Sequence, residues 1–185
     1  MQSVNTQAVL SIECGTPYLS LGLTVNGHSI GGQGVTGHDV AGHNVTGRGF
    51  SFSRVTEVGR THAERLPAEL EALFAEAALP LRADKIVIGS GPGSYTGLRV
   101  GASYALGLGR AWGVPVLGVC TLEGLAGAED GVVAETLHPA ARYPLTNFGV
   151  LAAGLEWRRD VPPDPLVLAR NGLDHGHEEW ELVYL

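Results

Sequence analysis

The sequence predicts a mixed α/β fold in which helices flank a single sheet. Three strand patterns follow one another before residue 54, and no helix pattern interrupts them. Beyond residue 80 the strand patterns alternate with helix patterns, and 44% of the residues are apolar, enough for a buried core. An order of β-β-β-α-β-α-β-α with right-handed crossovers places antiparallel and parallel strands in one sheet.

The first two strands form a predicted β-hairpin. A short apolar strand at Val9–Ile12 ends in a polar turn that Pro17 closes. From Leu19 to Val25, large apolar residues alternate with small ones, a period of two that is typical of a strand with one buried face. Two strands joined by a tight turn indicate a hairpin. Phe50 and Phe52, which alternate with serines, predict a third strand.

Residues 27–49 interrupt this pattern with a glycine-rich pentapeptide repeat (VTGHD, VAGHN, VTGRG). A period of five matches neither a strand nor a helix, so its valines cannot all face one core. Ordering so much glycine costs backbone entropy, which predicts a flexible insertion between two strands. His38 and His43 raise the possibility of metal binding, but a solvated low-complexity loop is the favoured interpretation. We therefore predict no metal site.

A helix is predicted over Thr61–Leu79. Thr61 and Glu64 fit a capping box, in which the two side chains satisfy free backbone N–H groups reciprocally. Pro67 predicts an irregular first turn or a later start. Apolar residues recur at helical spacing and predict one buried stripe: Leu66, Leu70, Leu73, Phe74 and Ala77.

The stretch Ile86–Arg99 predicts a buried strand, a Gly-Pro-Gly turn and a helix that Ser94 caps and that runs to about Trp112. Such a corner serves either as an anion cradle or as a tight turn that seats the helix on its sheet. Small residues recur every fourth position in this helix: Gly97, Gly101, Ala105 and Gly109. By spacing alone, packing on the chain's own sheet is favoured over a contact with a partner helix.

A strand at 114–119 and a short helix at 122–126, which Thr121 caps, complete the first lobe, residues 1–127. Beyond it, short strands are predicted at 131–134, 148–152 and 166–169, and the acidic segment 174–179 is predicted to be solvated. These residues, 128–185, are few for an independent core, so we expect a shortened second lobe that leans on the first.

Composition excludes several classes of function. The net charge is −7 and the 12 Lys and Arg residues are scattered, which excludes direct nucleic-acid binding by the free chain. No stretch is apolar enough to span a membrane, and no leader peptide is recognisable. Cys14 and Cys120 lie far apart, which predicts buried free thiols in a cytoplasmic protein. The chain lacks a P-loop, a nucleophile elbow and metal-binding motifs, which predicts a non-enzyme without a cofactor.

Gly91–Gly101, GPGSYTGLRVG, closely resembles the GPGSFTGLRIG signature of the TsaB (YeaZ) family. Three further stretches resemble this family in the same order: Leu10–Ser20, His62–Leu66 and Gly118–Glu123. The resemblance covers roughly residues 8–127 and is faint afterwards, at Ala141-Arg142 and Pro165–Arg170.

The resemblance implies a two-lobed actin/ribonuclease-H-like fold and a non-catalytic subunit. That subunit pairs with TsaD, a paralogue that binds ATP and transfers the carbamoyl group to tRNA, and the ATPase TsaE joins them. The tRNA is reached only through this complex, and a homodimer through the same helices is plausible without a partner. The implied partner interface comprises Leu66, Leu70, Leu73, Gly97, Gly101, Ala105 and Gly109. The implied signature loop comprises Gly91, Pro92, Gly93, Ser94, Thr96, Gly97 and Arg99.

The chain departs from the family pattern at its first strand. Glu13 stands where the family has an aspartate, and Cys14 replaces a threonine, so Glu13 and Thr16 are interpreted as a degenerate nucleotide site. The pentapeptide insertion has no evident counterpart, and the second lobe is short. Two alternatives therefore stay open. One is an actin-like kinase or hydrolase that uses the glycine loop and Glu13, and the other is a diverged, inactive copy.

Overall fold

A computed structural model describes residues 7–26, 49–126, 132–135, 156–159 and 162–184. Its main sheet has the strand order β3-β2-β1-β4-β5. The strands are β1 (Gln7–Glu13), β2 (Tyr18–Asn26), β3 (Gly49–Glu57), β4 (Lys85–Gly89) and β5 (Val116–Val119). β1, β2 and β3 pair antiparallel, whereas β1, β4 and β5 pair parallel. The predicted hairpin and mixed sheet are therefore confirmed.

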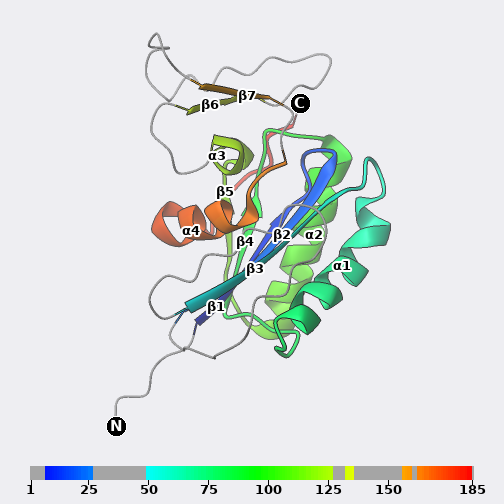
Figure 1. The fold of residues 1–185 in the computed structure, drawn as a ribbon, viewed down its shortest axis with the longest axis vertical. Helices are drawn as coiled ribbons and strands as arrows, with labels where there is room; N and C mark the ends of the chain where they lie inside the picture. Colours follow the sequence, from blue (N-terminus) through cyan, green and yellow to red (C-terminus); the bar gives the residue numbers. More distant parts are fainter. Residues whose placement is uncertain (1–6, 27–48, 127–131, 136–155, 160–161, 185) are drawn as a thin grey trace.

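Helices cover both faces of this sheet (Figure 1). The elements are α1 (His62–Glu76), α2 (Tyr95–Trp112), α3 (Thr121–Ala126) and α4 (Pro165–His175). α1 and α2 share one hydrophobic core with Leu10 and Ile12 of β1. On the other face, Val9 lies in a second cluster with Leu168 of α4. The alternation of β1 side chains thus serves two cores, which explains why this central strand carries apolar side chains on both faces.

The prediction of a strand at Leu166–Ala169 is wrong, because these residues lie in α4. The Asp164 carboxylate accepts hydrogen bonds from the N–H groups of Leu166, at 2.8 Å, and Val167, at 3.3 Å. Pro165 occupies the first helical position, where its missing N–H costs nothing. This N-terminal signal outweighs the short apolar run, and α4 then packs on β1, β2 and β4.

The remaining elements match the predictions in part. A short parallel pair joins β6 (Val132–Glu135), predicted at 131–134, to β7 (Glu156–Arg159), which was not predicted. The pentapeptide repeat and the predicted strand at 148–152 lie outside the described residues. The boundary between the lobes after residue 127 stays a prediction.

The predicted capping box at the start of α1 is wrong. Thr61 occupies the N-cap position, but its side chain caps no helical N–H. Its hydroxyl instead donates to the Val58 carbonyl, at 2.9 Å, because the chain enters the helix from a tight turn after β3. Pro67 lies inside the helix, which begins at His62.

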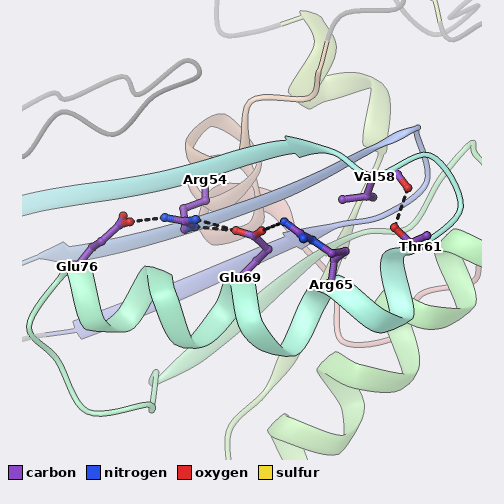
Figure 2. Close-up of polar contacts among 6 residues, drawn as sticks. All are labelled: Arg54, Val58, Thr61, Arg65, Glu69 and Glu76. Atoms are coloured by element: carbon purple, nitrogen blue, oxygen red, sulfur yellow. Dashed lines mark hydrogen bonds and ion pairs between the residues drawn. The ribbon is translucent and has the colours of Figure 1, made fainter.

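An ion-pair network holds α1 against β3 (Figure 2). The Glu69 carboxylate accepts from the Arg54 guanidinium at 2.8 and 3.0 Å and from Arg65 at 2.7 Å. Arg54 also pairs with Glu76 at the end of the helix. Glu69 is buried, so this carboxylate depends on its two arginines for the hydrogen bonds that water would otherwise supply.

Glu69→Ala is expected to lower the free energy of unfolding by about 1–2 kcal/mol, because it removes charge-assisted hydrogen bonds. The loss is limited, since the freed arginine side chains can turn to solvent. Urea unfolding followed by circular dichroism measures this change. Glu71→Ala, on an exposed position of the same helix, is the matched control and should change stability by less than about 0.5 kcal/mol. Equal effects of the two substitutions would show that the network contributes nothing.

Candidate functional site

The signature loop and first turn of α2, residues 91–99, form a corner that is held against the β1–β2 turn. The Ser94 N–H donates to the Gly15 carbonyl at 2.7 Å. The Ser94 hydroxyl accepts from the Gly97 N–H at 3.4 Å, so the predicted cap of α2 is confirmed. Gly91 has a φ of 109°, a conformation that favours glycine. The corner therefore sets where α2 begins and how it approaches β1.

Glu13 lies beneath this corner, fully buried at the end of β1. Its carboxyl accepts from the Gly15 N–H at 2.6 Å, the Thr121 hydroxyl at 3.3 Å and the Thr16 hydroxyl at 3.4 Å. Burial raises the pKa of Glu13 to about 7, and these hydrogen bonds only partly oppose the shift. Among the described residues, no salt bridge reaches this carboxyl. An environment that favours a neutral acid is poorly suited to hold phosphate charge.

The end of the chain lies over the same corner. The Val183 N–H donates to the Ser90 carbonyl at 2.9 Å, and the Gly93 N–H donates to the Val183 carbonyl at 3.2 Å. The Trp180 indole N–H donates to the Val116 carbonyl at 3.0 Å, and the ring covers Gly118.

The prediction of a solvated segment at 174–179 therefore needs correction. The backbone of His177 pairs with that of Gly118, at 2.9 and 3.4 Å, beside β5. Asp174 and His175 are the last residues of α4. The side chains of Asp174, His175, His177, Glu178 and Glu179 are exposed, so the charges are solvated while the backbone is bound.

The small-residue stripe of α2 faces the chain's own sheet. A Cβ on Gly97 would overlap the Cys14 carbonyl oxygen, one on Gly101 would lie 3.2 Å from the Cys14 side chain, and one on Gly109 would lie 2.6 Å from Val116. Ala105 is fully buried, as are Leu66, Leu70 and Leu73 of α1. These seven residues pack α1 and α2 on the sheet, and the partner interface predicted at them stays a prediction.

The opposite side of α2 is exposed and has a different chemistry. We call the exposed residues Tyr95, Arg99, Ser103, Leu106, Gly107 and Arg110 the α2 outer face. Leu106 is half-exposed, at 51%, and the Cβ direction of Gly107 meets open space. α2 contains no acidic residue, so this face combines two cations with an exposed aliphatic side chain.

Sequence reasoning missed the α2 outer face although a signal was present. Two steps along a helix turn about 200°, so residues two positions after the buried stripe point away from it. Ser103 and Gly107 have this relation to Gly101 and Ala105. The pattern of small residues directed the prediction to the opposite, buried side of α2.

The signature-loop residues divide between the two environments. Gly91, Pro92, Gly93 and Gly97 are buried, whereas Ser94, Thr96 and Arg99 are exposed. The Arg99 guanidinium lies 4.0 Å from the centre of the Tyr95 ring. Its Nε–H donates to the Tyr184 hydroxyl at 3.3 Å, and the two tyrosine rings are 4.7 Å apart. Arg99 thus joins the first turn of α2 to the end of the chain.

The described residues contain no group of three or more histidine, cysteine or acidic side chains that could hold a metal ion. His38 and His43 lie outside these residues. Cys14 is a buried free thiol, as predicted, and Cys120 is a free thiol that is only half-buried. None of the helices in the described ranges is both long and apolar enough to span a bilayer.

Comparisons with known proteins place this geometry in context. Residues 55–144 match the family model described as "TsaD: tRNA N6-adenosine threonylcarbamoyltransferase". An uncharacterized protein of Mycobacterium tuberculosis is 33% identical over 181 residues, which cover 95% of this chain and 77% of that protein. The tRNA threonylcarbamoyladenosine biosynthesis protein TsaB of Bacillus subtilis is 34% identical over 124 residues, 65% of this chain and 53% of TsaB.

Solved structures show the same fold. YeaZ from Pseudomonas aeruginosa superimposes with a TM-score of 0.69 and 22% sequence identity, and the match covers 97% of this chain and 100% of YeaZ. The predicted α/β fold of actin/ribonuclease-H type, with a mixed sheet between helices, is therefore confirmed.

Proposed function

The chain belongs to the TsaB (YeaZ) family, and from this premise we propose that it is a non-catalytic subunit that docks on and activates a TsaD-type paralogue. The reaction served is the formation of N6-threonylcarbamoyladenosine in tRNA. A TsaE-type ATPase joins the pair, and tRNA is reached through the complex. The net charge of −7 supports the proposal that this chain does not bind tRNA by itself, because phosphates repel an isolated acidic chain.

The surroundings of Glu13 support a non-catalytic role. In open α/β sheets, ligands bind at the carboxyl ends of the parallel strands. Here that edge is occupied by the buried Glu13 carboxyl and by the Val183 backbone, both bonded to the chain itself. A nucleotide-binding kinase or hydrolase needs this edge open and suited to anionic phosphate, so we do not propose one.

The α2 outer face is the surface on which we propose that the partner docks. The observation that carries the proposal is the half-exposed Leu106, which lies between Arg99 and Arg110 on a helix whose other side is packed. An apolar centre bordered by arginines suits a partner surface with acidic residues around a hydrophobic groove. Without the partner, the same face serves a homodimer.

Leu106→Arg is expected to weaken association with the TsaD-type paralogue by about 30-fold or more, because a charge then replaces the apolar centre of the interface. Titration of the purified paralogue by calorimetry measures the dissociation constant. The monomer stays folded, because Leu106 already faces water.

The matched control is Arg170→Glu on α4, an exposed charge reversal on the other face of the sheet, which should leave the affinity unchanged. Absence of a complex between the wild-type proteins at micromolar concentration would overturn the proposed function. Unchanged binding by Leu106→Arg would overturn only the choice of surface. Failure of the chain to restore the tRNA modification in cells that lack their own TsaB would instead favour an inactive copy.

A further inference from the structure

Both ends of the loop Gly91–Ser94 are attached to residues that bind the Glu13 carboxyl. At one end, the Ser94 N–H donates to the Gly15 carbonyl at 2.7 Å, and the Gly15 N–H donates to Glu13 Oε1 at 2.6 Å. At the other end, the Gly91 N–H donates to the Thr121 hydroxyl at 3.1 Å, and that hydroxyl donates to the same Oε1 at 3.3 Å. The Thr121 N–H also donates to the Gly91 carbonyl, at 2.8 Å. One carboxyl oxygen therefore connects both ends of the loop.

The groups that face this carboxyl are uncharged on every element that packs against it. They are Gly15 and Thr16 of the β1–β2 turn, Ser20 of β2, Gly89 of β4 and Thr121 of α3. The titratable group nearest in the chain, the Cys14 thiol, lies against Gly101 on the other face of the sheet. A Cβ on Gly89 would lie 2.7 Å from Glu13 Cγ, so no space for water is left on that side.

We propose that the Glu13 carboxyl is a proton-controlled latch on the loop Gly91–Ser94. While the carboxyl holds its proton, it stays buried and the loop is fastened at both ends. When the proton is lost, local opening of the corner becomes easier, because opening brings the carboxylate into water. The first turn of α2 begins at this loop, so opening also frees the end of the helix that carries Tyr95 and Arg99.

The direction of the effect follows from linkage. In the closed corner the pKa of Glu13 is about 7, whereas in an open, hydrated corner it returns to its ordinary value of 4.5. The closed state therefore binds the proton more tightly. The equilibrium constant for opening of the corner increases as the pH rises from 4.5 to 7. The full difference corresponds to an increase of about 300-fold, since each pKa unit is a factor of ten. Above pH 7 the equilibrium becomes constant.

Amide hydrogen exchange, followed by NMR between pH 5 and pH 8 and corrected for intrinsic exchange, tests the latch. The Gly91 and Ser94 amides are expected to lose about 100-fold in protection over this range. Glu13→Gln stays neutral at every pH and should show no such loss. The opening is local, so exchange at these amides should depend less on added urea than exchange at the centre of β2.

A second variant separates the two fastenings. Thr121→Val keeps the shape of the side chain but removes its hydroxyl, so the Gly91 amide should lose protection at all pH values while the Ser94 amide keeps its bond to Gly15. The proposal is overturned if the two amides exchange only by global unfolding, with the urea dependence of β2. It is also overturned if Glu13→Gln shows the wild-type pH dependence.

Discussion

Gly97→Ala is expected to lower the free energy of unfolding by about 3 kcal/mol, at the upper end of the usual cost of overpacking. The added methyl group would overlap the carbonyl oxygen of Cys14, which is backbone and cannot rotate away. The neighbouring Gly15 carbonyl accepts from the Ser94 N–H at 2.7 Å, so α2 cannot move outward without breaking its own N-terminal attachment. Urea unfolding followed by far-UV circular dichroism measures the loss.

The same substitution ten residues further along α2, at Gly107, gives a matched control. Gly107 is exposed, and no atom lies within 4 Å of the position that its Cβ would take. Gly107→Ala should therefore stabilise the protein by about 1 kcal/mol, the difference between glycine and alanine in an exposed helix interior. Opposite signs for one substitution on one helix are the expected result. Stabilisation by both variants would mean that α2 does not sit on β1 as described.

The fold was predictable because its signals are local. The alternation of Leu19–Val25, the helical spacing of Leu66–Phe74 and the cap at Ser94 each lie within a few turns of chain. The end of the chain was predicted less well. Leu166–Ala169 is too short to distinguish a strand from a buried helix by periodicity, and Asp164 with Pro165 was the better signal.

The candidate site was predictable only in part. A stripe of small residues is equally compatible with a close approach to a sheet or to another protein, and only the tertiary contact of Gly101 with Cys14 decides between them. Gly101→Leu should therefore disrupt the monomer rather than test partner binding alone. The contact between Glu13 and Thr121 joins residues 108 positions apart, and no local pattern predicts it.

Glu13 should also make the stability of the whole protein depend on pH in an unusual direction. In the unfolded chain its carboxyl is hydrated and has an ordinary pKa of 4.5, whereas burial raises the pKa to about 7 in the fold. Between these values the folded protein binds more protons than the unfolded chain, so the contribution of Glu13 falls as the pH rises. The expected loss is about 3 kcal/mol from pH 4.5 to pH 7, with no further change above pH 7.

Glu13→Gln isolates this contribution, because the other ionisable groups are unchanged and cancel in the comparison. The amide keeps an oxygen for the Gly15 N–H, and its nitrogen can donate to the Thr16 hydroxyl, which lies 3.4 Å from Oε2. Stability measured by urea unfolding at pH 5, 6, 7 and 8 should favour the wild type progressively less relative to the variant. The decisive quantity is the slope with pH of the difference in free energy of unfolding between wild type and variant. This slope does not depend on how well the amide packs.

A difference between wild type and Glu13→Gln that stays constant with pH would mean that the folded protein leaves Glu13 with its ordinary pKa. That outcome would require water or a cation beside the carboxyl, and the close approach of Gly89 leaves no room for either on its side. Ionising a buried acid that has no cation beside it costs free energy near neutral pH. Here that cost destabilises the corner from which α2 begins.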